Sequence, residues 1–237
     1  MAGITDGLFC SKLAPQGFDM VTVGGFNVDL KTVLAGKSIK ERGRPEFDIP
    51  YNQILSFIED QINIIQGTAW KGMVSVNLRS TTPSSIVEVS EIDGVDVVEI
   101  NAHCRQPEIM ELDCGQSLLH KPDDLYRFTR TVVNDASCKV SVKIRANVPG
   151  TDIINTSNLI EDAGADFLHV DAMKPGYPHA DYKTISSISD QTDIFLIGNN
   201  SIKDVNSAKK MLKAGADGIS LARAVINGEV PFNLSSI

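Results

Sequence analysis

The stretch Ala163-Gly-Ala-Asp-Phe-Leu-His-Val170 returns in outline as Ala214-Gly-Ala-Asp-Gly-Ile-Ser-Leu-Ala222. In both copies a Gly is followed two residues later by an Asp, and the Asp opens a short apolar run. Gly often ends a helix in the left-handed conformation, and Asp is frequent in tight turns. The shared stretch therefore predicts a helix, a turn and a buried strand, in that order, at two places in the chain.

The same Gly-x-Asp signature occurs twice earlier, at Gly17/Asp19 and at Gly94/Asp96. Three further apolar runs lie between the four marked ones, and every run has the length and residue content of a buried strand. The seven expected strands are Asp19–Gly24, Met73–Leu78, Val95–Asn101, Lys139–Arg145, Asp166–Val170, Asp193–Gly198 and Asp217–Ala222.

Helix-forming stretches separate these strands. Within Tyr51–Gln66 the apolar residues recur at helical spacing, and Gly67 follows as a stop signal. The residues of that apolar face are Ile54, Leu55, Ile58, Ile62 and Ile65. Pro122 is placed to open another helix, and Ser201 is expected to cap a third that runs through Leu212. Alternating strands and helices are typical of a parallel α/β fold.

The alternation predicts a (β/α)8 TIM barrel. Marked and unmarked strands alternate, so an unmarked strand is expected before Asp19, where only Met1–Ala2 is available. We expect this first strand to be truncated or absent, with the natural start upstream or another segment over the gap. No change in composition marks a boundary, so residues 1–237 are expected to form one domain. An open doubly wound sheet is the alternative, but no Gly-rich nucleotide fingerprint follows the first strand.

Composition excludes several classes of protein. Of the 237 residues, 42% are hydrophobic and 22% are charged, which is typical of a globular chain and not of a disordered one. No apolar stretch approaches a membrane span, and no signal peptide is evident. The net charge of −8 disfavours a broad nucleic-acid surface, although residues 37–44 contain four basic side chains. We expect a cytoplasmic protein that is not bound to a membrane and whose cysteines are reduced.

Polar side chains mark the carboxyl ends of the expected strands, where barrels of this type build their active sites. They are Asn77, Arg79, Glu99, Asn101, His103, Cys104, Lys143, Arg145, His169 and Asp171. Lys143 is the most informative, because an inward lysine in an apolar run needs an anionic partner.

The last two expected strands indicate a phosphate site. Gly198 allows backbone to approach a ligand closely, and Ser201 is expected to open a helix whose free N–H groups attract an anion. Ala222 is small, and Arg223 can bind phosphate oxygens through two hydrogen bonds. Phosphate binding after strands seven and eight is common in TIM barrels.

Six motifs follow one another over nearly the whole chain. They are Met1-Ala-Gly-Ile-Thr-Asp6, Ile100-Asn-Ala-His-Cys104, Val140-Ser-Val-Lys-Ile-Arg145, His169 with Tyr177 and Ala180-Asp-Tyr182, Ile197-Gly-Asn-Asn-Ser-Ile202 and Leu221-Ala-Arg-Ala224. Together they resemble the tRNA-dihydrouridine synthases and the related FMN-binding barrels of dihydroorotate dehydrogenases. Four residues depart from the synthase pattern: His103 and Arg105 replace Gly and Pro, Asp171 replaces Arg, and Ser201 replaces Asp. The synthases' C-terminal helical domain is expected to be absent, because the chain stops where the barrel should end.

This resemblance implies an FMN-dependent oxidoreductase that acts on the C5–C6 bond of a pyrimidine, with uridine in tRNA as the first expectation and NAD(P)H as electron donor. It implies that Lys143 lies beside the flavin and that Asn77 bonds to the flavin edge. Cys104 would protonate C5 while Asn101 faces the base, since such enzymes leave hydride transfer to the cofactor. The residues implied around the phosphate are His169, Gly198, Asn199, Ala222 and Arg223.

Two other functions are compatible with the same residues. A dihydroorotate or dihydropyrimidine dehydrogenase would act on a free pyrimidine, and a non-catalytic barrel would bind flavin or phosphate without turnover. The joint presence of Cys104, Lys143 and His169 favours an enzyme. No cluster of Cys and His has the spacing of a common zinc site, so no metal is expected.

Overall fold

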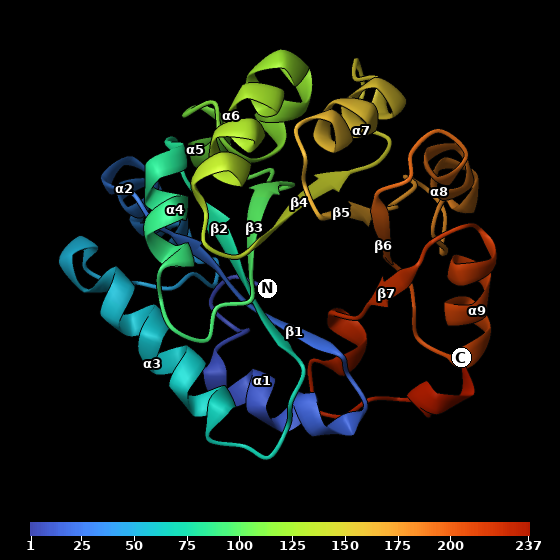
Figure 1. Cartoon of the computed structure of the whole chain (residues 1–237), viewed down its shortest axis with the longest axis horizontal. Coiled ribbons are helices and arrows are strands. Elements are labelled where there is room, and N and C mark those ends of the chain that lie inside the picture. The colour runs from blue at the N-terminus through green and yellow to red at the C-terminus, as the bar shows by residue number, and fades with distance from the viewer.

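A computed structural model describes residues 1–237, and its centre is one curled parallel sheet of seven strands (Figure 1). The strands are β1 Met20–Asn27, β2 Met73–Arg79, β3 Val97–Ala102, β4 Lys139–Arg145, β5 Phe167–Asp171, β6 Phe195–Asn199 and β7 Gly218–Ser220. They pair in sequence order from β1 to β7, which is the strand order of a TIM barrel. All seven expected strands are confirmed, with ends that differ by a few residues.

Helices cover the outer face of the sheet (Figure 1). They are α1 Gly7–Leu13, α2 Leu30–Glu41, α3 Ile54–Gln66, α4 Pro83–Ser90, α5 Pro107–Met110, α6 Pro122–Asp135, α7 Ile153–Asp162, α8 Tyr182–Ser189 and α9 Val205–Lys213, with 3-10 turns η1 Ala14–Gln16, η2 Tyr51–Gln53, η3 Gly115–His120, η4 Arg223–Val225 and η5 Leu234–Ser236. Leu55 was expected on the buried face of α3 but is 43% exposed. None of these helices combines the length and apolar content needed to cross a membrane.

Helix α9 begins three residues later than the sequence predicts. Its N-cap is Asp204, whose carboxylate accepts a hydrogen bond of 2.7 Å from the N–H of Ser207. Ser201, the predicted cap, lies in the preceding loop with a φ of 56°, in the left-handed region. The prediction that a helix beginning at Ser201 offers N–H groups to an anion is therefore wrong. The first turn of α9 already holds a carboxylate of the protein.

The Gly-x-Asp signature joins neighbouring strands in pairs. In three of its four copies the Asp carboxylate accepts a 2.8 Å hydrogen bond from the second residue of the preceding strand. The pairs are Asp96 with Val74, Asp166 with Val140, and Asp217 with Leu196. The glycines of these copies have φ values of 82°, 87° and 103°, where other residues are strained. The signature thus links β2 to β3, β4 to β5 and β6 to β7.

Strands β1 and β7 are not hydrogen-bonded to each other, so the ring of strands has a seam. Met1–Ile4, where a stub of strand was expected, forms a turn. The N-terminus lies near the centre of the ring in Figure 1, and the amino group of Met1 donates to the carbonyl of Gly24 over 3.2 Å. Residues 1–4 therefore form no strand before β1.

The segment that follows β7 runs back beside η1, on the seam side of the molecule. The side chain of Gln16 donates to the carbonyl of Gly228 and accepts from the N–H of Val230, both over 2.9 Å. Phe232 packs against the hydrophobic core from the same segment. The C-terminal segment, and not an eighth strand, therefore makes the contacts on this side.

Inward side chains of the strands form an apolar layer below a polar one. Because side chains alternate along a strand, every second residue of each strand enters the barrel. The lower layer consists of Met20, Met73, Val97, Phe167 and Ile197. Above it the inward positions are Asn77, Glu99, Ser141, Lys143, His169 and Ser220, which lie on β2, β3, β4, β5 and β7. The polar layer lies toward the carboxyl ends of the strands, where the site is expected.

We predict that Asp166→Ala lowers the free energy of unfolding by about 1–3 kcal/mol, because it leaves the N–H of Val140 without its acceptor. In a chain of this size each kcal/mol lowers the melting temperature by about 2–4 °C. Asp19→Ala is the matched control. Asp19 belongs to the same signature, but no strand precedes β1 and its carboxylate is exposed, so the loss should stay within about 0.5 kcal/mol. Thermal unfolding followed by circular dichroism measures both, and equal losses would contradict the pairing role.

Candidate active site

A buried chain of hydrogen bonds crosses the polar layer from Glu99 to Lys143. Oε2 of Glu99 accepts the Nδ1–H of His169 over 2.7 Å, so Nε2 of a neutral His169 carries no proton. That nitrogen lies 3.3 Å from Nζ of Lys143 and 2.7 Å from Oγ of Ser220, and both of these groups can donate to it. The chain connects β3, β4, β5 and β7 and holds the ammonium of Lys143 at the upper end of the barrel.

Burial and charge set the protonation states along this chain. Burial lowers the pKa of His169, and the ammonium of Lys143 lowers it further, so the imidazole stays neutral. Burial raises the pKa of Glu99, but His169, Lys143 and the hydrogen bond from Asn77 outweigh it and hold that pKa well below its ordinary range. Glu99 is therefore the anionic partner that Lys143 was expected to need, and His169 connects the two.

Sequence reasoning noted Glu99 at a strand end but gave it no role. The available signal was the alternation in β3, where Val97, Glu99 and Asn101 share one face. A carboxylate in the middle of an apolar strand has to point to polar partners, because burying an unpaired charge is costly. Its partners come from three other strands, and no spacing along the sequence could identify them.

Asn77 and Asn101 extend the network from Glu99 to the loop that carries Cys104. Asn77 donates to Oε1 of Glu99 over 2.7 Å, and its Oδ1 accepts from Nδ2 of Asn101 over 2.8 Å. Oδ1 of Asn101 accepts the N–H groups of His103 and Cys104 over 3.1 and 2.8 Å. Asn101 thus fixes the backbone of the Cys104 loop, and each Asn keeps one amide hydrogen outside these bonds.

The Cys104 thiol lies beside a buried ion pair. Nη1 of Arg79 is 3.7 Å from its Sγ, and Arg79 is only 1% exposed. The guanidinium pairs with Glu46 and donates to the carbonyl of Gly25 over 2.9 Å. The carbonyl of Cys104 accepts the N–H of Gln116 over 2.7 Å. The backbone around the thiol is therefore held on both sides, and the cation in contact with the thiol is already neutralised.

A second charged cluster occupies the top of β4 and β5. Nε2 of His103 lies 2.6 Å from Oδ2 of Asp171 and 2.7 Å from Nη2 of Arg145, and Arg145 and Asp171 pair directly at 3.0 Å. Asn200 donates to the other oxygen of Asp171 over 2.7 Å. Burial lowers the pKa of His103 to about 4, with Arg145 and Lys143 adding to the effect against the opposing Asp171. Two departures from the synthase pattern, His103 and Asp171, are thus in direct contact.

Gly198 serves the packing of α9. A Cβ at this position would lie 2.5 Å from Cγ and Sδ of Met211, so the missing side chain makes room for the helix. The next residue, Asn199, points into the barrel, where its Nδ2 donates to the carbonyl and hydroxyl of Ser220 over 2.8 and 2.7 Å. The inward group that β6 offers at the site is therefore Asn199.

The loops after β6 and β7 present backbone donors without protein acceptors. They are the N–H groups of Asn200, Ser201, Ala222 and Arg223. Asn200 and Ser201 have φ values of 99° and 56°, and backbone N–H groups in such consecutive turns form concave anion sites. The side chain of Arg223 is exposed at the same edge and is close enough to Arg145 to lower its pKa, after burial and together with Arg105. This edge combines N–H donors with a cation.

The basic stretch at residues 37–44 is partly engaged in ion pairs. Lys40 pairs with Asp48 over 2.7 Å, and Arg42 pairs with Glu108 over 2.9 Å, which ties α2 to the start of α5. These contacts are exposed, so they add little to stability. Two of the four cations in this stretch are thus not free for a nucleic acid.

Comparison with known sequences finds the dihydrouridine synthases among the proteins that this chain resembles. The sequence profile of the family described as "Dihydrouridine synthase (Dus)" matches residues 55–232. A protein of Methanocaldococcus jannaschii, described as uncharacterised, is 38% identical over 97% of this chain and 88% of its own length. tRNA-dihydrouridine synthase B of Serratia marcescens is 25% identical over 65% of this chain and 48% of its own length. The chain therefore spans about half the length of the named synthase that it matches.

Solved structures share the fold at low sequence identity. A FabK variant from Thermotoga maritima superposes with a TM-score of 0.60 over 95% of this chain and 60% of its own, at 14% identity. DHODH from Eimeria tenella gives 0.58 over 77% and 61%, also at 14% identity. A 2,3-dimethylmalate lyase gives 0.61 over 94% and 75%, at 16% identity. These likenesses support the barrel fold alone.

We predict that His103 makes the protein less stable in mild acid. Its pKa is about 4 in the folded chain and near the ordinary 6.5 in the unfolded one, so only the unfolded chain gains a proton between these values. Between pH 7 and 4.5 the wild type should lose about 2–3 kcal/mol more unfolding free energy than His103→Gln. Asp171 keeps Arg145 as a partner in that variant.

Urea unfolding at several pH values measures this difference. His120→Gln changes an exposed histidine on the surface and should reproduce the wild-type profile. A His103→Gln profile parallel to that of the wild type would contradict the neutral, buried state of His103.

Proposed function

The chain belongs to the dihydrouridine synthase family, and from this premise we propose that it reduces the C5–C6 double bond of uridine in RNA with FMN as cofactor and NAD(P)H as electron donor. The observation that carries the proposal is one hydrogen-bonded network at the mouth of the barrel, which is the end where the carboxyl ends of the strands meet. It joins the cation of Lys143 to the loop of Cys104 through Glu99 and the two asparagines. The relatives named tRNA-dihydrouridine synthase B support a uridine in tRNA as the substrate.

The residues at the mouth fit FMN. The free N–H groups of Asn200 and Ala222, with the guanidinium of Arg223, are the donors that a phosphate requires. The ammonium of Lys143 suits the ring edge that becomes negative in a reduced flavin, and the spare amide hydrogen of Asn77 suits a ring heteroatom. When bound, FMN would supply the hydride for C6 of the base. The carboxylate of Glu99 is linked to the side chain of Lys143 through His169.

Cys104 is the proposed proton donor to C5. Asn101 and Gln116 hold its backbone, so the thiol keeps a fixed place at the mouth. Glu46 neutralises Arg79, so the thiol does not lie beside an unpaired cation. A positioned acid of this kind contributes about 10²–10⁴-fold to a proton transfer. The spare amide hydrogen of Asn101 is available to orient the base.

Product analysis tests the reaction. The protein is reconstituted with FMN and given NADPH with an unmodified tRNA transcript, and the digested nucleosides are examined by mass spectrometry for dihydrouridine. Uridine, uracil and orotate serve as parallel substrates. Turnover of a free pyrimidine alone would make the protein a dehydrogenase of free pyrimidines. FMN binding without turnover of any of them would make it a non-catalytic barrel.

We predict that FMN binding depends on two cations of the mouth. Lys143→Met and Arg223→Ala should each weaken FMN binding by about 10-fold or more, the effect of losing one charge-assisted hydrogen bond. Arg127→Ala on α6 removes an exposed arginine far from the mouth and should leave the affinity unchanged. Quenching of flavin fluorescence in a titration gives the dissociation constants. Undiminished FMN binding by the variant that combines Lys143→Met with Arg223→Ala would contradict the assignment of FMN as the cofactor.

We predict that Cys104→Ala separates the two half-reactions. Reduction of bound flavin by NADPH should proceed as in the wild type, because the thiol takes no part in it. Oxidation of the reduced flavin by RNA should slow by about 10²–10⁴-fold, since the proton donor is lost. Single-turnover absorbance measurements follow both steps, and Cys138→Ala, at a cysteine outside the site, is the control. Equal reoxidation rates would leave His103 or a bound water as the acid.

A further inference from the structure

The loop between β5 and α8 carries aromatic side chains in mutual contact. The ring centroids of Tyr177 and His179 lie 5.5 Å apart, and those of His179 and Tyr182 lie 6.1 Å apart with planes inclined by only 14°. Nζ of Lys174 is 4.6 Å from the ring centroid of Tyr177. Tyr177 is 55% exposed, so the outer ring of this aromatic ladder faces solvent. Packing in the core does not explain the exposed ring.

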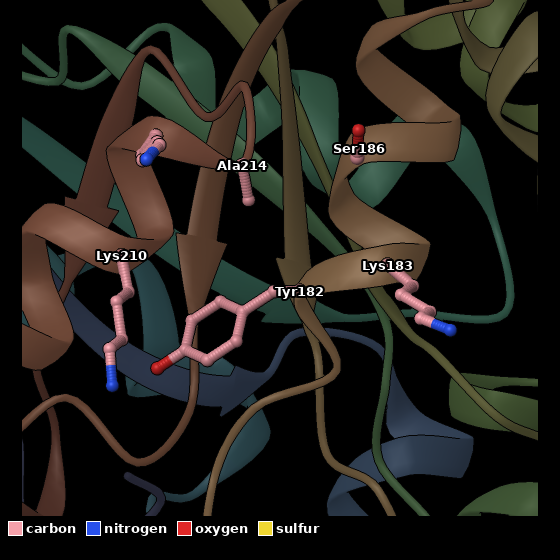
Figure 2. Close-up of a pocket in the computed structure, with 6 residues that line it drawn as sticks. Tyr182, Lys183, Ser186, Lys210 and Ala214 are labelled. Carbon is pink, nitrogen blue, oxygen red and sulfur yellow. The ribbon is translucent and has the colours of Figure 1, made fainter.

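The ladder leads into a shallow, open groove between α8 and α9. Its volume is about 320 Å³, and Figure 2 shows the ring of Tyr182 pointing toward Lys210 on the neighbouring helix. The residues that line it are Tyr182, Lys183, Ser186, Lys210, Lys213 and Ala214. Tyr182 thus belongs both to the aromatic ladder and to the groove, which makes them one continuous surface.

The charge of this surface is opposite to that of the chain. Residues 201–213 contain four lysines and a single acid, Asp204, whereas the whole chain has a net charge of −8. None of these lysines forms an ion pair, and Asp204 is engaged in capping α9. Lys210 and Lys213 lie in the last turn of α9, where cations are favourable for the helix. Helix stability therefore explains their presence in part, but it leaves their ammonium groups without an ion-pair partner within the chain.

We propose that the ladder and the groove bind an extended single-stranded segment of the RNA substrate, next to the base that enters the mouth. The inference rests on the proposed function. Stacking platforms beside rows of cations are the combination that binds single-stranded nucleic acid, with rings on the bases and lysines on the phosphates. Lys174 follows Asp171 of the mouth by three residues, so the ladder belongs to the loop that begins at the mouth.

A membrane surface fits this region less well. Binding in a bilayer interface requires exposed aliphatic side chains beside the cations. The large aliphatic side chains that are exposed are Leu8, Leu30, Leu34 and Leu55 on α1, α2 or α3, and Ile226 and Ile237 in the segment after β7, so none lies on α8 or α9. In Figure 1 helices α1, α2 and α3 are far from α8 and α9.

Fluorescence anisotropy tests the proposal with a labelled 12-nucleotide oligouridylate and with an unmodified tRNA transcript. Lys210→Glu with Lys213→Glu should weaken binding of both by about 10-fold and lower the slope of log Kd against log salt by about 1.4, because each phosphate contact on a single strand contributes about 0.7. Lys12→Glu with Lys71→Glu makes the same change of charge at exposed positions on α1 and before β2. That control should bind RNA like the wild type.

Tyr177→Ala tests the stacking half of the proposal. It should weaken binding of the oligouridylate by about 5- to 100-fold, the effect of losing one stacked base, without changing the salt dependence. Tyr177→Phe should bind like the wild type. Undiminished binding by both the lysine variant and Tyr177→Ala would overturn the proposal. Competition by inorganic polyphosphate as strong as that by RNA would do the same and mark a general anion surface.

The outcomes separate this inference from the proposed reaction. Binding needs no turnover, and melting temperatures equal to that of the wild type establish that the variants fold. RNA binding that responds to the variants, without dihydrouridine formation by the wild type, would contradict the reaction alone. Dihydrouridine formation with RNA binding that ignores both variants would contradict this surface alone.

Discussion

The buried carboxylate of Glu99 is the constraint on which the rest of the site depends. A charge inside a barrel is tolerated only when it is paired and hydrogen-bonded, because its desolvation costs several kcal/mol. Glu99 accepts hydrogen bonds from Asn77, Ser141 and His169, which come from β2, β4 and β5. Each of these strands must therefore present a polar residue inward at the same height, and the upper half of the barrel is polar for that reason.

Two halves of the mouth depend on this one carboxylate. On one side Glu99 orients His169, and the unprotonated Nε2 of His169 meets the ammonium of Lys143. On the other side it orients Asn77 and then Asn101, which holds the Cys104 loop. The ammonium of Lys143 and the loop of Cys104 are thus placed relative to each other by a single network. Loops of independent conformation would not provide that precision.

The strands were predictable from sequence because their apolar runs and Gly-x-Asp turns are local signals. The tertiary features of the site were not predictable in this way. Ser201 and Asp204 are both good helix caps, and only the left-handed backbone at Ser201 excludes the first. Gly198 can be explained locally as a flexible residue, but in the structure its missing side chain leaves space for the side chain of Met211, which lies thirteen positions away in the sequence. The role of Glu99 could be recognised only from the register of the neighbouring strands. The residues that face the mouth were predictable, while their partners were not.

His103 and Asp171, two residues that depart from the synthase pattern, are in direct contact with each other. With Asp171 in place of an arginine, Arg145 has a carboxylate 3.0 Å away instead of a second cation. His103 fills the space beside that pair and remains neutral, because burial and Arg145 lower its pKa to about 4. The charge at the top of β4 and β5 is therefore satisfied within the protein. Arg223, which is exposed and forms no ion pair, remains the free cation at the end of β7.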